Sequence, residues 1–120
     1  MSRNYSIENA DGVTTIRLQR SLTLDEMFEM MQHVAHTDEC NRRLWDVTEK
    51  FSFTSEEIKK IADRGRILWP SASRVAFLAV DNLSFGLLRM LEVFREQETY
   101  ETRVFRDEQA ALKWLKESLE

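Results

Sequence analysis

Three polar side chains at the ends of apolar stretches are the residues best placed to do chemistry. Asp46 and Thr48 lie at the end of the stretch formed by residues 43–47, and Asp81 follows residues 75–80. If these stretches are parallel strands, the side chains emerge at the carboxyl edge of the sheet, where open α/β folds bind ligands and where two carboxylates can hold Mg²⁺. The alternative is that each aspartate starts a loop or caps a helix. We favour the second interpretation and predict no metal and no cofactor.

A second group of polar side chains lies at the end of the first predicted helix. His33, His36, Asp38 and Cys40 can all bind metals, but their spacing matches no metal-binding motif. Both histidines lie opposite the apolar face of that helix, so we expect them in solvent. Cys40 is the only cysteine, and its neighbours match no thiol-enzyme signature. Because the chain also lacks a phosphate-binding glycine loop and a nucleophile elbow, we predict that it is not an enzyme.

Apolar residues in the helix after Asp81 exceed what one buried face needs. Phe85 and Leu88 lie off the apolar stripe of that helix, which contains Leu83, Leu87, Met90, Leu91 and Phe94. Together with Trp69, Phe51 and Phe53 they predict an apolar patch that serves as a dimer interface, a ligand-binding mouth or a membrane contact. The alternative is that these side chains pack against neighbouring loops and complete the core.

Five arginines are candidates to surround such a patch. Basic residues beside an apolar surface suit anionic lipid headgroups. The same residues are equally well explained as partners in ion pairs on helix surfaces, such as Arg89 with Glu92 or Glu96. The five are Arg64, Arg66, Arg74, Arg89 and Arg95.

Strands and helices alternate after an opening hairpin. Asp11-Gly12 is a tight-turn signal between two alternating β-rich segments, residues 5–8 and 13–18. Thr23 and Thr54 each have a glutamate three residues later, which predicts two helices that begin with capping boxes. The second of these helices ends before Pro70, the only proline.

The remaining elements follow from apolar patterning. Residues 75–80 are apolar at every position, as in a strand that is covered on both faces, and they are our candidate for the central strand. A helix capped by Asp81 or Asn82, a weaker strand at residues 101–105 and a helix that begins near Asp107 complete the order ββαβαβαβα. This order predicts an α/β fold with a mixed, mostly parallel five-stranded sheet and about four helices.

Composition excludes several classes of protein. A chain of 120 residues with 42% hydrophobic and 32% charged residues can build one core, so we predict a single domain over residues 1–120. The net charge of −4, with both signs interspersed, disfavours nucleic-acid binding. No apolar run resembles a signal peptide or reaches bilayer length. We expect a cytoplasmic protein, with peripheral membrane association as an alternative.

The whole pattern resembles the SpoIIAA-like branch of the STAS superfamily. That resemblance implies a small non-enzymatic module, related in shape to the CRAL-TRIO lipid carriers, in which an N-terminal hairpin leads into βα units. Some members regulate protein partners, and others are proposed to bind apolar ligands or membranes. The segments that carry the resemblance are the hairpin at residues 5–18, Leu22-Thr23, and residues 44–48, 53–58 and 74–80.

The chain departs from this pattern at the site where anti-anti-sigma members are phosphorylated. Those members carry Asp-Ser-Ser/Thr-Gly at the start of the helix after the third strand. Ser55 lies at about this position, so it is the candidate phosphoacceptor, but Glu56 and Glu57 follow it. Like-charge repulsion would oppose a phosphate there, and the capping box explains the segment without one.

The sequence thus leaves functions of different classes open. Our leading expectation is a homodimeric module that associates reversibly with a regulatory protein or a membrane surface through Trp69, Phe85 and Leu88. The alternative is a carrier that holds a small apolar molecule between helices and sheet. A phosphorylation-controlled regulator and a metal-dependent enzyme that uses Asp46 and Asp81 are less favoured.

Overall fold

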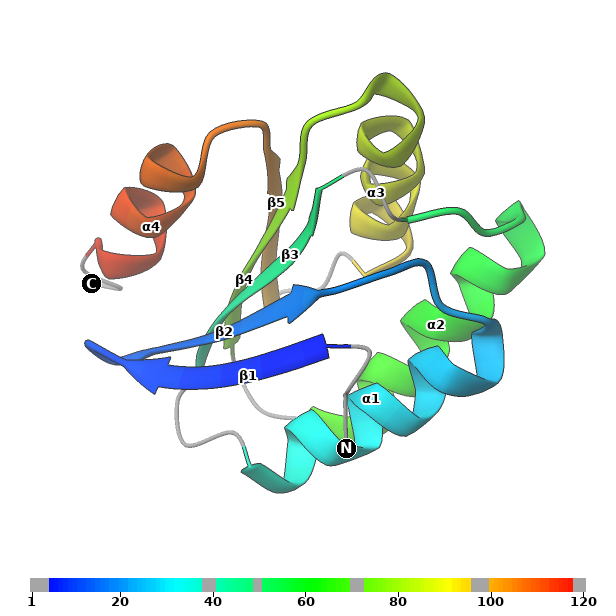
Figure 1. The fold of residues 1–120 in the computed structure, drawn as a ribbon, viewed down its shortest axis with the longest axis horizontal. Coiled ribbons are helices and arrows are strands. Elements are labelled where there is room, and N and C mark those ends of the chain that lie inside the picture. The colour runs from blue at the N-terminus through cyan, green and yellow to red at the C-terminus, as the bar shows by residue number, and fades with distance from the viewer. Residues whose placement is uncertain (1–4, 38–40, 49–50, 70–72, 96–99, 118–120) are drawn as a thin grey trace.

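The computed structural model describes residues 5–37, 41–48, 51–69, 73–95 and 100–117, and the order of elements is the predicted one. The strands are β1 (Tyr5–Ala10), β2 (Val13–Leu18), β3 (Arg42–Thr48), β4 (Ser73–Ala79) and β5 (Tyr100–Phe105). The helices are α1 (Leu24–Thr37), α2 (Ser55–Leu68), α3 (Asn82–Arg95) and α4 (Glu108–Lys116). Figure 1 shows the sheet between α4 on one side and the other three helices on the other.

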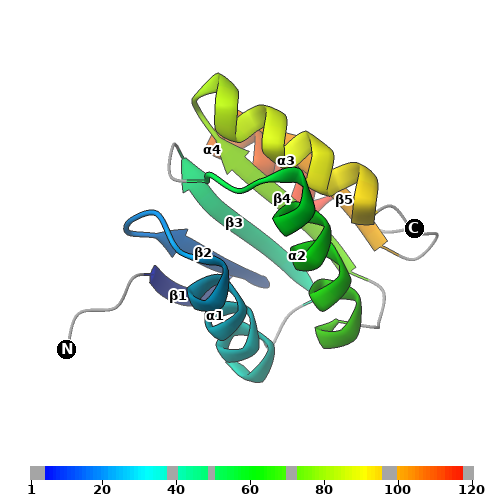
Figure 2. The same ribbon diagram turned by 90° about the vertical axis from the view of Figure 1, so that its right-hand side faces the viewer.

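The sheet has the strand order β1-β2-β3-β4-β5, with β1 antiparallel to β2 and every other pair parallel. From β2 onward each strand lies beside the one before it in sequence. Right-handed crossovers that all step in one direction place their helices on one face of the sheet. Figure 2 accordingly shows α1, α2 and α3 side by side in front of the sheet, with α4 behind it. The predicted mixed, mostly parallel sheet is confirmed.

Local signals fix the hairpin and the helix starts. Asp11 and Gly12 both have positive φ, 54° and 77°, as a two-residue hairpin turn with the right twist requires. The capping box of α2 is complete, because the Glu57 amide donates to Thr54 Oγ1 (3.2 Å) and the Thr54 amide donates to Glu57 Oε1 (2.9 Å). Thr23 makes the same pair of bonds at the start of α1. Pro70 lies outside the described residues.

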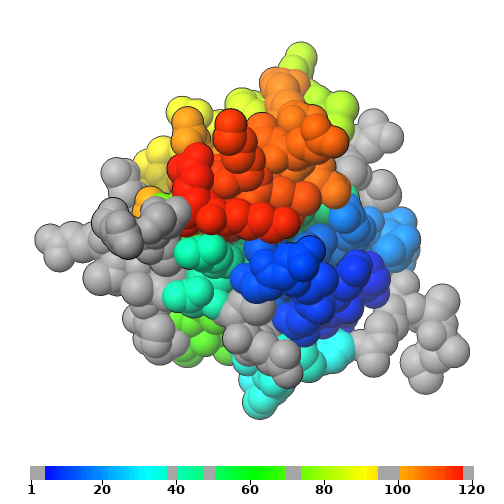
Figure 3. Space-filling view, turned by 90° about the vertical axis from the view of Figure 1, so that its left-hand side faces the viewer, coloured from blue at the N-terminus to red at the C-terminus, as the bar shows by residue number. Residues whose placement is uncertain are grey.

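The two faces of the sheet bury separate apolar clusters. Alternate residues of β4 point to opposite faces: Val75 and Phe77 pack under α1–α3, whereas Ala76 and Leu78 pack under α4. The prediction that this strand is covered on both faces is correct, but the middle strand of the five is β3. Figure 3 shows the β1–β2 hairpin beside α4, which does not cover it completely, and Val13 of β2 packs in the cluster under α4.

The orientation of α3 corrects the sequence analysis. Leu88 was expected to lie off the buried stripe but is fully buried, whereas Leu83, expected to face inward, is 63% exposed. The buried face is formed by Ser84, Leu88 and Leu91, which also have helical spacing. Because Ser84 is polar, the sequence pattern did not identify this face as the buried one. Its hydroxyl donates a hydrogen bond to the Phe51 carbonyl (3.1 Å), which lets a serine occupy the core.

The predicted patch of five residues is not a surface. Phe51 and Phe53 are buried in the core with their rings edge to face at 5.0 Å, and Leu88 is buried beside them in the same cluster. Trp69 and Phe85 are partly buried and pack against this cluster. For Leu88, Phe51 and Phe53 the alternative of core packing is therefore correct.

Candidate functional site

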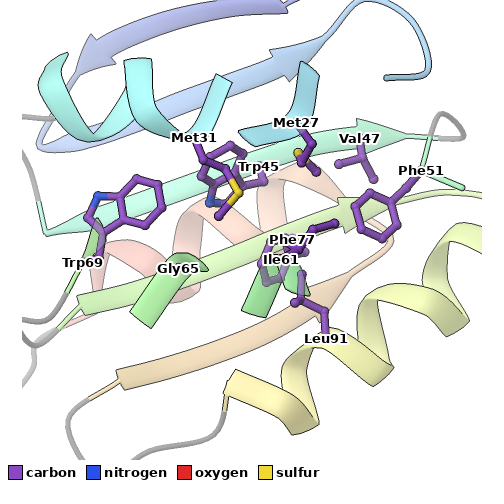
Figure 4. Close-up of a pocket in the computed structure, with 10 residues that line it drawn as sticks. All are labelled: Met27, Met31, Trp45, Val47, Phe51, Ile61, Gly65, Trp69, Phe77 and Leu91. Atoms are coloured by element: carbon purple, nitrogen blue, oxygen red, sulfur yellow. The ribbon is translucent and has the colours of Figure 1, made fainter. Parts of the chain in front are cut away.

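An apolar pocket lies between α1, α2 and the sheet. Its volume is about 40 Å³. Figure 4 shows Trp69 and Phe51 at opposite ends, with the other side chains between them. The lining residues are Met27, Met31, Trp45, Val47, Phe51, Ile61, Gly65, Trp69, Phe77 and Leu91. Because none of them ionises, the pocket can bind an apolar group but offers no acid, base or nucleophile.

Helical and strand periodicities bring these residues together. Met27 and Met31 are four residues apart on α1, so they lie on the same face. On α2, Gly65 comes one turn after Ile61 and one turn before Trp69, the C-cap residue. A glycine inside a helix lowers stability by about 1 kcal/mol relative to alanine. At this position it also leaves the wall of the pocket without a side chain.

The Trp69 end of the pocket combines aromatic rings with a buried cation. Trp69 packs edge to face on Trp45, with ring centres 5.9 Å apart. The guanidinium carbon of Arg43 lies 4.6 Å from the centre of the Trp69 ring, and Arg43 is only 1% exposed. The indole Nε1–H of Trp69 is buried and has no hydrogen-bond acceptor among the described residues. The N–H donors of the Trp69 indole and of the charged Arg43 guanidinium therefore lie at the Trp69 end of the pocket.

The pocket is small. A volume of about 40 Å³ is well below the roughly 150 Å³ of an engineered apolar cavity that accepts benzene. Met27 and Met31 are the most adaptable lining residues, since methionine has three rotatable side-chain bonds. A ligand of that size or larger therefore requires rotamer changes of these methionines or a wider spacing of α1 and α2.

Asp46 takes part in an ion-pair network on the opposite face of the sheet. Arg17 Nη1 donates to Asp46 Oδ2 (2.6 Å) and to Glu108 Oε1 (2.8 Å), and Nη2 donates to Glu108 Oε2 (3.1 Å). These bonds lower the pKa of Glu108, chiefly through the hydrogen bond from Arg17, and raise that of Arg17. The network joins β2 and β3 to the first turn of α4.

Asp81 has the capping role that the sequence favoured. Its Oδ2 accepts a hydrogen bond from the Ser84 amide (2.9 Å) at the start of α3, and this bond lowers the pKa of Asp81. Thr48 ends β3 beside an irregularity in the pairing with β4, and its side chain is outside the description. No group of three potential metal-ligating side chains occurs among the described residues.

The other candidates lie away from the pocket lining. Ser55 is exposed at the first position of α2. His36 is exposed as predicted, but His33 is half-buried, and its Nδ1 forms a hydrogen bond with the Tyr5 hydroxyl of β1 (2.7 Å). The expectation that both histidines lie in solvent is wrong for His33. Asp38 and Cys40 lie outside the described residues.

The arginines expected around a patch have separate roles. The predicted ion pair between Arg89 and Glu92 is present, with a distance of 3.8 Å. Arg74 is buried on the α4 side, where it donates to the carbonyl of Trp114 (2.8 Å). Arg64 stacks on Phe28 of α1. Arg66 forms an ion pair with Asp63, and the side chain of Arg95 lies outside the described part of the structure.

Of the residues that line the pocket, the sequence pattern singles out only Trp69 and Phe51 as candidates for a binding surface. Met27 and Met31 were recognised as one face of a helix, and Trp45 as part of a strand. Nothing in their spacing distinguishes a residue that lines a pocket from one that fills the core. The usable signal was the coincidence of a mid-helix glycine, Gly65, with this apolar face.

Comparisons with known proteins identify the fold. No family model matches the chain, and no curated protein matches it. It is similar to a solved structure from Shewanella loihica PV-4, described as an uncharacterised protein of the DUF3478 family with a SpoIIAA-like fold. The two share 20% identity over 96% of this chain and 98% of that one, with a TM-score of 0.61. Among the described residues no helix is both long and apolar enough to cross a membrane. The chain has a SpoIIAA-like fold.

Proposed function

We propose that this domain is a non-enzymatic binding module that holds a small apolar molecule between α1, α2 and the sheet. The pocket supports this proposal, because its lining is apolar throughout and includes two methionines and four aromatic side chains. Binding sites for small molecules are concave and mostly apolar. Of the functions that the sequence left open, carriage of an apolar ligand is the one that agrees with the positions of Trp69 and Phe51 in the pocket lining.

Native mass spectrometry of the purified protein tests the proposal directly. We expect an excess mass that is released on collisional activation, and saturable binding of decanol or decanoate to protein stripped of it. Gly65→Ala adds a methyl group to the pocket wall and should weaken binding. Gly86→Ala is the matched control, because Gly86 is also inside a 14-residue helix but a Cβ there meets no atom within 4 Å. Absence of both an excess mass and saturable binding would exclude the carrier.

Association through α3 is the second candidate function. An outward apolar stripe on this helix contains Leu83 and Val93, which are 63% and 64% exposed, with Gly86 and the partly buried Met90 between them. Together α2 and α3 carry six basic and four acidic side chains, although the whole chain is acidic. This balance favours an anionic membrane surface or an acidic protein over a second copy of the chain.

The double variant Leu83→Asp, Val93→Asp tests association without disturbing the core. Sedimentation with vesicles of anionic phospholipid measures membrane binding, and analytical ultracentrifugation measures the oligomeric state. Both would be recorded for the variant and for the wild-type protein. Loss of vesicle binding would support a membrane surface, and loss of a dimer would support self-association. If the wild-type protein is monomeric and does not bind vesicles, only association with another protein is left of this second candidate. Co-purification from the source cell would then test for that partner.

A further inference from the structure

We infer that the ligand is an amphipathic anion, a carboxylate with an alkyl tail, whose head group is recognised by Arg43 and Trp69. This inference rests on the proposed function. It starts from the two ends of the pocket, which differ in chemistry: the Phe51 end is wholly apolar, whereas the Trp69 end has a buried guanidinium and a buried indole N–H.

The geometry of β3 orders these groups along the pocket. Arg43, Trp45 and Val47 alternate with Leu44 and Asp46, so their side chains share the face of the sheet that carries the pocket. At about 3.3 Å per residue, Arg43 lies roughly 13 Å from Val47 along the strand. A ligand parallel to β3 therefore has its tail beside Val47 and Phe51 and its head beside Arg43.

Both groups at that end are donors only, and an anion complements them. The Trp69 Nε1–H has no acceptor among the described residues, and Figure 4 shows this nitrogen on the side of the ring away from Phe51. An indole can only donate, and a guanidinium has five N–H donors. A carboxylate that accepts the indole N–H would lie near the positive charge of Arg43, whose guanidinium carbon is 4.6 Å from the centre of the Trp69 ring. A fully apolar ligand would leave the indole donor unsatisfied, which is unfavourable in a buried site.

The test compares ligands that differ only in the head group. Decanoate, its methyl ester and decan-1-ol are titrated by calorimetry at about pH 8, where the carboxylic acid is ionised. We expect decanoate to bind at least about tenfold more tightly than the ester, as charge-assisted hydrogen bonds imply. In Arg43→Met this preference should disappear while ester binding is kept, and Arg43→Lys should restore part of it. Trp69→Phe keeps a ring but removes the N–H, so it should reduce the preference a few fold.

Arg74→Met is the matched control, because Arg74 is also a buried arginine stacked on a tryptophan, Trp114, but lies on the opposite face of the sheet. It should leave the preference unchanged. Equal affinities for acid, ester and alcohol would overturn the head-group inference and leave the apolar carrier intact. A preference that survives Arg43→Met, or that is lost equally in Arg74→Met, would also overturn it. If no ligand of the three binds, the proposed function itself fails.

Discussion

Two leucines of α3 allow a direct test of how this helix packs. Leu88 is completely buried, so Leu88→Ala removes core contacts and leaves a cavity. Such substitutions lower the free energy of unfolding by about 2.7–5 kcal/mol. Leu83 is 63% exposed, so little more than a third of its surface is buried. A fully buried leucine contributes about 1.5–3 kcal/mol, which gives about 1 kcal/mol or less for Leu83→Ala before a small gain in helix propensity.

Urea unfolding followed by circular dichroism measures the difference. With a slope of about 1–3 kcal/mol per molar urea, Leu88→Ala should lower the midpoint by about 1 M or more. Leu83→Ala should lower it by less than about half as much. The two variants share a residue type, a helix and a substitution, so burial is the main variable between them.

The opposite ranking would refute this packing. If Leu83→Ala were the more destabilising variant, α3 would present to the sheet the stripe that the sequence pattern first suggested. Equal effects would mean that neither face is specifically packed, and they would remove the support for an outward apolar stripe at Leu83 and Val93.

Three further predictions concern charge and backbone conformation. The pKa of Glu108 is lowered in the folded state, chiefly by the hydrogen bond from Arg17. Its contribution to stability is therefore present above its unfolded pKa and is lost as pH falls through its lower folded pKa. Glu108→Gln should lower stability by less than about 1 kcal/mol at neutral pH and by less in acid, as urea unfolding at both pH values will show. Gly86→Ala, inside α3, should raise the free energy of unfolding by about 1 kcal/mol. Gly12→Ala should lower it by about 1 kcal/mol, because Gly12 has φ 77°. Thermal unfolding in which Gly12→Ala is the more stable variant would contradict the helix and turn geometry. Mg²⁺ should leave the Tm unchanged, because Asp46 and Asp81 make separate contacts; a rise in Tm with Mg²⁺ that Asp46→Asn abolishes would reveal a metal site.

Features set by residues close in sequence were predictable. The hairpin turn needs positive φ at two adjacent positions, and Asp11-Gly12 supplies it. The capping boxes depend on residues three apart, so Thr54 with Glu57 defined the start of α2 before any packing was known. Spacing also predicted the order of the strands and helices.

Features set by contacts between distant elements were not predictable. Two stripes of α3 have helical spacing, and the one that is buried contains Ser84, which is stable there only because the Phe51 carbonyl accepts its hydroxyl hydrogen bond. A pattern cannot show an acceptor that lies 33 positions earlier in the chain. The ion pair of Asp46 was not predictable for the same reason. Its guanidinium partner, Arg17, comes from β2, and only the register of the sheet brings the two together.

The two faces of the sheet differ in how their helices are held, and this difference favours one of them for binding. On one face α4 is fixed at both ends by arginines: Arg17 holds Glu108 in its first turn, and Arg74 donates to the Trp114 carbonyl near its last. On the other face the Tyr5 hydroxyl holds α1 through His33, and Arg66 of α2 donates to the Phe94 carbonyl of α3. The pocket itself is bounded by apolar contacts, including the flexible side chains of Met27 and Met31. Apolar contacts are non-directional, so they tolerate small shifts that would break hydrogen bonds. The apolar lining of the pocket therefore suits the ligand that we propose, and hydrogen bonds from Arg17 and Arg74 hold α4 on the other face.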